Sequence, residues 1–336
     1  MCTNQATGYG MRALLALGGW LLIGGRPLCA QDNSLRATLS IDRDSYVLGQ
    51  PLFWGLSLEN TGPQMVRASV AERLEGITLE LAFGEADYVP VRLHVVSTLS
   101  SGAPVRNILP GDKVGNCGAF LFVAPRIRTL TPAMLAEALR ERRLVCATPG
   151  NYKLRATIHL HYGDRETAIC SNSVGFAVRV AGEGFDKFLE LAQQHVVEMH
   201  LSPSGYRRAE DLLRDIGNSA YGEGLRAMTM EYLLQTRMTD ETDPNALPDD
   251  ERHQRGFYKD LAEAVLRDHV RPTMLREIAF RYMLVYHAQA KEYEKALSVA
   301  NQARREMPWS VPAQTTARIE RAIQRAGHSA PTRTGG

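Results

Sequence analysis

The spacing of apolar residues changes once along this chain, near residue 181, from every second residue to every third or fourth. Before the change, apolar and polar residues alternate, as in LRATLSID (residues 35–42). After it, apolar residues recur at helical spacing, as in FDKFLELAQQHVVEMHL (residues 185–201). Alternation is typical of strands with one buried face, and the longer spacing is typical of amphipathic helices. The sequence therefore predicts a multidomain protein with a β region followed by an α region.

The first region, residues 31–181, is predicted to be an antiparallel β-sandwich. Its apolar segments are separated by turn sequences such as ENTGP, LPGD and TPGN. Short strands with turns at this spacing are typical of two packed antiparallel sheets. One segment, residues 131–145, has helical spacing instead, with Thr131 at the N-cap and Pro132 at the first helical position. We therefore expect a short helix inserted between two strands of the sandwich.

The second region, residues 185–326, is predicted to be all-α. Seven segments of helical spacing follow one another with short connections, which is typical of a helical-hairpin array or bundle. The segment VAGEGFD, residues 180–186, is the expected junction with the sandwich. The last ten residues, 327–336, are polar and rich in glycine, so we expect them to form a disordered tail.

The first 30 residues have the pattern of a secretory signal peptide. A polar start carrying Arg12 is followed by an uncharged apolar run over residues 13–25 and by RPLCA, which places cleavage after Ala30. The apolar run is shorter than the roughly 20 residues of a membrane-spanning helix. An uncleaved anchor is the alternative. Either way, the protein is expected to be exported to the periplasm, the cell surface or the exterior.

The charge balance of the mature chain does not favour nucleic acid as a partner. Residues 1–30 contain two arginines and no acidic residue, so 39 − 2 = 37 basic residues remain against 37 acidic ones. A protein that binds phosphate backbones usually has an excess of basic residues on one face. No later apolar segment approaches the length of a membrane span, so the mature chain is expected to have none.

The pair His159 and His161 is the feature that most resembles part of a metal site. A spacing of two places both side chains on one face of a strand, and the apolar residues of NYKLRATIHLHY occupy the other face. Both histidines are therefore predicted to point outward, beside other polar residues. A metal ion would need a third ligand, for which His94 is the candidate. We predict solvent-facing histidines and no metal site.

No sequence signature of catalysis is assembled in this chain. The glycine-rich patterns GxGxxG and GxxxxGK[ST] of nucleotide-binding loops are missing, as is the Gly-x-Ser-x-Gly of a nucleophile elbow. The sequence therefore predicts a protein that is not an enzyme and that binds no cofactor.

The mature chain keeps three cysteines, Cys117, Cys146 and Cys170. Disulfides form in the oxidising compartments to which exported proteins are sent. Because successive antiparallel strands reverse direction, Cys117 and Cys170 are expected at the same end of the sandwich and Cys146 at the other. We predict a Cys117–Cys170 disulfide, with Cys146 left as a thiol.

The motifs DSYVLGQPLFWGLSLENTG, ILPGDK and TPGNYKLRATIHL resemble bacterial immunoglobulin-like domains of secreted multidomain proteins. The segment AFRYMLVYHAQAKEYEKALSVANQARREMPWS resembles a tetratricopeptide helix pair, with Ala296, Ala303 and Pro308 where that repeat has small, small and proline residues. Leu284 and His287 depart from the pattern. The resemblance implies an exported protein with an immunoglobulin-like sandwich followed by a tetratricopeptide-like helical domain.

These features predict a non-catalytic binding or scaffolding protein. Helical arrays offer a groove and sandwiches offer loops, so we expect a protein or peptide partner to engage the helical domain, the sandwich loops or both. One alternative is a secreted protease inhibitor that acts through the loop Ser97–Asn107. Another is a hydrolase with a site between the domains that the sequence does not reveal.

Overall fold

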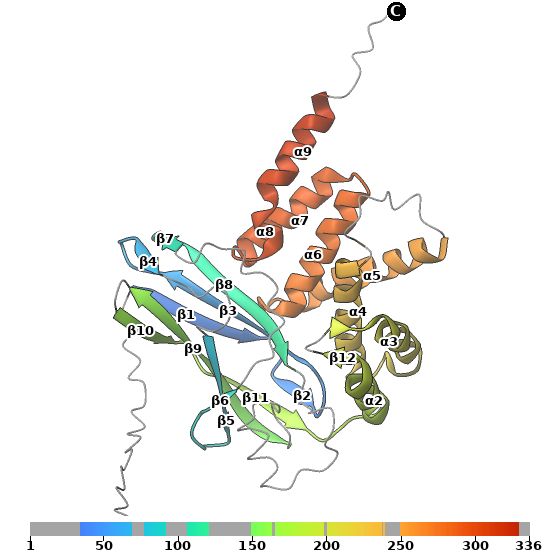
Figure 1. Ribbon diagram of the computed structural model, residues 1–336, viewed down its shortest axis with the longest axis horizontal. Helices are drawn as coiled ribbons and strands as arrows, with labels where there is room; N and C mark the ends of the chain where they lie inside the picture. The colour runs from blue at the N-terminus through green and yellow to red at the C-terminus, as the bar shows by residue number, and fades with distance from the viewer. Residues whose placement is uncertain are drawn as a thin grey trace, which may run out of the picture.

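The computed structural model describes residues 34–68, 77–91, 106–120, 149–162, 165–197, 200–236, 238 and 249–328 (Figure 1). Strands come first along the chain and packed helices follow, so the predicted fold class is confirmed. The strands are β1 (Leu35–Ile41), β2 (Ser45–Val47), β3 (Leu52–Asn60), β4 (Val66–Ala68), β5 (Ile77–Phe83), β6 (Val89–Val91), β7 (Arg106–Ile108), β8 (Lys113–Phe120), β9 (Gly150–Tyr162), β10 (Arg165–Cys170), β11 (Val174–Arg179), β12 (Val196–Val197) and β13 (His200–Leu201). The helices are α2 (Phe185–His195), α3 (Pro203–Ile216), α4 (Gly222–Thr236), α5 (Asp249–Asp268), α6 (Met274–Gln289), α7 (Tyr293–Glu306), α8 (Val311–Gln314) and α9 (Thr316–His328). Within these residues, none of the helices has the length and apolar character needed to cross a bilayer.

Two sheets make up the β region. Sheet A has the strand order β1-β3-β8, and sheet B has the order β2-β11-β9-β5-β6, with β10 also paired to the long strand β9. All of these pairs are antiparallel except one, because β2 runs parallel to β11. The two packed sheets bear out the predicted sandwich, and β2 adds one parallel pair at the edge of sheet B. Two short ladders, β4–β7 and β12–β13, lie apart from the main sheets.

The space between the two sheets is filled by large apolar side chains, as the alternation predicted. Trp54 is the largest of the fully buried side chains, and it lies between the sheets among residues of both. Leucines and isoleucines from every second position surround it, and they are Leu39, Ile41, Leu52, Leu56, Leu58, Leu79, Leu154, Ile158 and Leu160. This core holds sheet A on sheet B.

The helices cover the part of the outer face of sheet A that lies on β3 and β8 (Figure 1), whereas Arg36 and Thr38 of β1 are exposed. Residues 52–56 of β3 are buried on both faces of the strand. Phe53, Cys117 and Ala119 point away from the sandwich core and belong to the same apolar cluster as the helices. Small residues permit this contact: a Cβ atom added to Gly55 would lie 1.9 Å from the carbonyl oxygen of Pro272. Sheet A is thus the middle layer between sheet B and the helices.

The disulfide predicted between Cys117 and Cys170 is wrong. Cys117 is a buried thiol on the outer face of sheet A, against the helices. Cys170 lies in β10 of sheet B, where its Sγ atom is 3.6 Å from Thr157 Oγ1 on the face opposite the sandwich core. The whole sandwich core therefore separates the two sulfur atoms. Cys170 itself is disulfide-bonded.

The helical region also departs from the prediction at its first helix. The expected helix over residues 185–201 ends at His195, and Val196–Val197 pairs with His200–Leu201 in the two-stranded ladder β12–β13 instead. The β-branched side chains of Val196 and Val197 favour this extended backbone. The last predicted helix is divided into α8 and α9, whereas α6 and α7 form the expected packed pair.

Several predictions fall on residues outside the described ranges. They concern the signal peptide over residues 1–30, the inserted helix over residues 131–145, the thiol of Cys146 and the tail after residue 328. These stay predictions, and the domain boundaries at residues 31–181 and 185–326 do as well.

Candidate functional site

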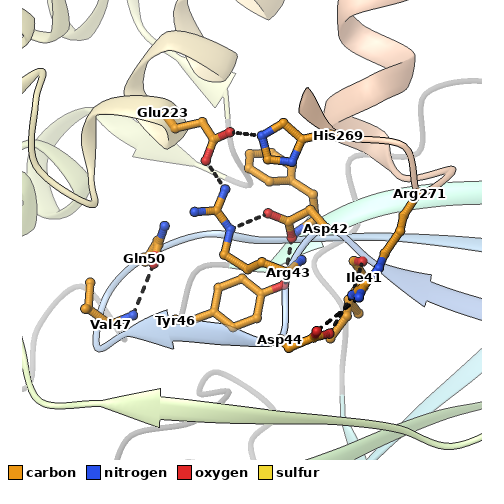
Figure 2. A network of polar contacts seen from close by, with 11 residues as sticks. Ile41, Asp42, Arg43, Asp44, Tyr46, Val47, Gln50, Glu223, His269 and Arg271 are labelled. Carbon is orange, nitrogen blue, oxygen red and sulfur yellow. Dashed lines mark hydrogen bonds and ion pairs between the residues drawn. The ribbon is translucent and has the colours of Figure 1, made fainter. Parts of the chain in front are cut away.

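A network of charged side chains joins the turn after β1 to the helical region (Figure 2). The turn contributes residues 42–44, which have the sequence Asp-Arg-Asp. The helical region contributes Glu223, in the first turn of α4, and His269 and Arg271, between α5 and α6. Residues more than 170 positions apart in the sequence therefore meet at one place on the border of sheet A.

Asp42 is the buried centre of this network, and its side chain has no exposed surface. Its Oδ1 atom accepts hydrogen bonds from the Tyr46 hydroxyl at 2.7 Å and from the Phe53 amide at 3.0 Å. Its Oδ2 atom accepts one from Arg43 Nε at 2.8 Å. Burial raises the pKa of Tyr46, and the negative charge of Asp42 raises it further. Tyr46 is therefore a permanent donor to Asp42 at neutral pH.

Arg43 carries the network from the sandwich to the helices. Its guanidinium pairs with Oε2 of Glu223, whose other oxygen lies 2.5 Å from Nε2 of His269. A carboxylate in the first turn of a helix is favoured by the helix dipole, which helps to hold Glu223 in place. Burial lowers the pKa of His269, and the positive charge of Arg43 lowers it further. The three side chains are largely shielded, with 20–26% of each exposed.

A second ion pair, Arg271 with Asp44, lies at the rim of the network. The two guanidinium nitrogens Nη1 and Nη2 bond the two carboxylate oxygens at 2.6 and 3.0 Å. The hydrogen bond from Arg271 lowers the pKa of Asp44 and raises that of Arg271. Because both side chains are well exposed, solvent screening limits this pair to about 0–1 kcal/mol. It orients the loop before α6 more than it stabilises the fold.

The network of Asp42, Arg43, Glu223 and His269 connects the sandwich to the helical region, and we call it the latch. Asp42 accepts three hydrogen bonds, and Glu223 is shared between one cation and one imidazole. Each charge therefore faces an opposite charge or a donor that belongs to the protein itself. Among the residues that the structure describes, no three His, Cys, Asp or Glu side chains lie close enough together to hold a metal ion.

The structure places the predicted histidine pair on β9. His159 is half-buried and pairs in register with Ala168 of β10, while its neighbours Ile158 and Leu160 lie in the sandwich core. The position of His159 opposite the core agrees with the predicted outward face. The side chain of His161, and all of His94, lie outside what the structure describes.

The end of the sandwich that carries the β4–β7 ladder has a second feature of interest, a rigid pair of loops. Buried Asn60 links them, because its Nδ2 atom donates to the carbonyl oxygens of Gln64 and Ile108, both at 2.8 Å. Its backbone nitrogen donates to Asp112 O at 3.1 Å, and its carbonyl accepts from Gly111 N at 2.8 Å. One side chain with its own peptide groups thus fixes the loops at residues 61–65 and 108–112 beside each other.

Exposed apolar side chains cap this rigid pair of loops. Leu109-Pro110-Gly111-Asp112 forms a turn closed by a 2.9 Å bond from Asp112 N to Leu109 O, and Gly111 has a φ of 80°. Proline followed by glycine at positive φ is typical of a type II turn. Leu109 is 51% exposed and Met65 is 52% exposed. We call Pro63, Met65, Leu109 and Pro110, which are all exposed, the sandwich tip.

From the sequence alone, both features are predicted to be ordinary turns. The sequence RDSYVLGQP is typical of a turn, and a charged turn has no visible partner until the chain is folded. Leu109 and Pro110 belong to LPGD, which forms the predicted turn, but nothing in the sequence indicates that Asn60 holds this turn beside Met65. The signal that was available is the apolar character of residues in turns, where polar residues are usual.

Comparison with known proteins finds distant structural matches only. No known protein family and no curated protein matches this sequence. Among solved structures, one similar chain is the sporulation control protein Spo0M from Bacillus subtilis, at 10% identity and a TM-score of 0.25 over 48% of this chain and 55% of Spo0M. Another is the CARDB domain of the PF1109 protein from Pyrococcus furiosus, in complex with di-metal ions, at 10% identity and a TM-score of 0.21 over 44% of this chain and 94% of that domain. The match thus spans about half the length of Spo0M, and such TM-scores carry no argument about function.

Proposed function

We propose that this protein is a non-catalytic, exported binding or scaffolding protein that engages a protein or peptide partner through the sandwich tip. The observation that carries the proposal is the pairing of exposed Met65 and Leu109 on loops that Asn60 holds rigid. A preorganised apolar surface loses little conformational entropy when it binds, so more of its contact energy appears as affinity. Export is supported by the signal-peptide pattern of residues 1–30.

The packing of the helices supports the tip over the helical groove as the binding surface. Helix α6 packs on β3 and β8, so the side of the array that faces sheet A is occupied by this chain itself. The resemblance to immunoglobulin-like and tetratricopeptide-like domains fits a scaffold of this kind. In such a scaffold the helices would act as a rigid support that orients the sandwich.

The test is a pull-down from the cell envelope of the protein's own organism. Three forms of the full protein serve as bait, namely the unaltered protein and two variants. The double variant Met65→Asp, Leu109→Asp alters the tip, and Phe257→Asp alters an apolar side chain on α5 that is 54% exposed. We expect the tip variant to lose at least about tenfold in captured partner, since apolar anchors of an interface typically contribute about 1–2 kcal/mol each. Phe257→Asp should bind as well as the unaltered protein.

Two results would contradict the proposal. Equal capture by the tip variant and the unaltered protein would exclude the tip as the binding surface. Loss of capture in Phe257→Asp alone would move the binding surface to the helices. Equal melting temperatures of the three forms, measured by circular dichroism, are the control for folding.

A further inference from the structure

A buried group of three charged side chains lies between α4 and α6, apart from the latch. Arg281 Nη1 bonds both oxygens of Glu231, at 3.1 and 3.2 Å. Glu277, one helical turn before Arg281, has its Oε2 atom 3.8 Å from the same nitrogen. That distance is too long for a hydrogen bond, and within the described residues this buried oxygen has no hydrogen-bond partner. The side chains of Glu231 and Glu277 are only 3% and 2% exposed.

The charges of this group do not balance when every member is ionised. The titratable groups that face Glu277 are Glu231 from α4, Arg281 from α6 itself and, next to Arg281, the Cys117 thiol from β8. The contribution of α8 is the Val311 amide, which is neutral. Two carboxylates and one guanidinium leave one negative charge where both carboxyl groups are almost fully buried, which is unfavourable. A single proton removes that charge.

The geometry decides which carboxyl group takes the proton. Glu231 holds the guanidinium with both oxygens and also accepts a 2.9 Å bond from Gln235 Nε2. Arg276, the next cation on α6, is engaged by Glu306 and by the carbonyl oxygens of Leu266 and His269. Glu277 is therefore left as the acid with the weakest support for a negative charge.

Glu277 also lies where its charge affects the junction of sheet and helices. It follows Thr273, the N-cap of α6, whose Cα atom would lie 3.2 Å from a Cβ atom on Gly55. The Glu277 amide donates to the Thr273 carbonyl at 3.0 Å. The helix that carries Glu277 is thus the one that rests on the outer face of sheet A.

We propose that Glu277 is a proton-operated lock: it is neutral when α6 rests on sheet A, and the contact between α6 and sheet A loosens as the surrounding pH rises. Burial raises the pKa of Glu277 from its ordinary 4.5 to about 8, Glu231 adds to the rise, and Arg281 opposes it. The closed form therefore keeps a proton that the opened form releases. Between about pH 4.5 and 8 each unit of rising pH favours opening by up to about tenfold, and above 8 the effect levels off.

The test is hydrogen exchange of the full protein, resolved by peptide, from pH 6.5 to 9 and corrected for the intrinsic pH dependence of exchange. This window begins at the ordinary pKa of histidine, and burial lowers the pKa of His269 below that value, so His269 is mostly neutral throughout. We expect protection of α6, α8 and β8 to fall by up to about tenfold per pH unit until pH 8 and then to stay constant. In Glu277→Gln, the same peptides should show protection that does not depend on pH.

Glu231→Gln provides the second variant. Arg281 is then available to Glu277 alone, so Glu277 should lose its proton at a lower pH. The pH above which protection stays constant should therefore be below 8. The lock is overturned if the unaltered protein shows no change of protection in this window. It is also overturned if either variant keeps the same slope and the same end point as the unaltered protein.

Discussion

The two faces of sheet A are built by opposite means. The inner face carries large side chains, of which Trp54 is the largest, and they fill the space to sheet B. The outer face carries Gly55, Gly115 and Cys117, and it lets the helices approach until backbone and ring atoms touch. A Cβ atom on Gly115 would lie 2.7 Å from the ring of Trp309. The inner face is packed mainly by large side chains, whereas on the outer face small residues beside Phe53 leave room for the helices.

This difference shows why a glycine can matter as much as a tryptophan in the same strand. Burial of apolar area stabilises the inner face, and its loss leaves a cavity. On the outer face the stabilising contacts belong to the helices, so any added atom pushes them away. Substitutions on the two faces should therefore act with opposite dependence on side-chain size.

The largest effect is expected from Trp54→Ala on the inner face. The side chain is fully buried, and its removal should lower the free energy of unfolding by about 3–5 kcal/mol because of lost burial and a residual cavity. Urea titration of the variant and of the unaltered protein measures this loss. A loss below about 1 kcal/mol would mean that the inner face is not closely packed.

A smaller effect is expected from Gly55→Ala on the outer face. The added methyl group meets the Pro272 carbonyl at 1.9 Å, so α6 must move, at a cost of about 1–3 kcal/mol. Gly175→Ala is the matched control, because the nearest atom to its Cβ lies 3.9 Å away. The control should change the unfolding free energy by no more than about 0.5 kcal/mol. If both variants behave alike in urea titration, the close approach of the helices is refuted.

The smallest of these effects is expected from Asn172→Ala, which tests how the two sheets are tied at one edge. Asn172 Oδ1 accepts from Leu39 N at 2.7 Å, and its Nδ2 donates to Leu39 O at 3.1 Å. The side-chain amide of Asn172 thus bonds both backbone groups of Leu39 on β1, which is an edge strand of sheet A. Loss of both bonds should cost about 1–2 kcal/mol, since Leu39 is nearly buried. Faster exchange of the Leu39 amide in the variant would confirm the role, and unchanged exchange would contradict it.

Much of this fold could be predicted from the spacing of apolar residues along the sequence alone. Alternation located the inner face of β3 and β9, because large apolar residues at every second position have one physical explanation. The outer face of sheet A could not be predicted in this way. Glycine, serine and alanine suit a solvent-facing surface and a closely packed one equally well, and only the folded helices decide between them.

The charged groups were harder to predict than the core. The latch depends on Arg43 meeting Glu223, and the lock depends on Glu277 sharing Arg281 with Glu231. Each residue by itself resembles an ordinary surface charge on a turn or a helix. The disulfide prediction is wrong for a related reason. Strand direction predicts which end of the sandwich a cysteine lies at, but it does not predict that Cys117 lies on the outer face of sheet A and Cys170 on the outer face of sheet B.

Because sheet A packs on sheet B with one face and on the helices with the other, we expect the sandwich and the helices to unfold as one cooperative unit. Native-state hydrogen exchange in increasing denaturant tests this claim most directly. Peptides from β9 in sheet B and from α6 should merge into one opening reaction with the same free energy and the same dependence on denaturant. If α6 loses its protection at a denaturant concentration where β9 keeps its own, the two regions are independent and the claim is wrong.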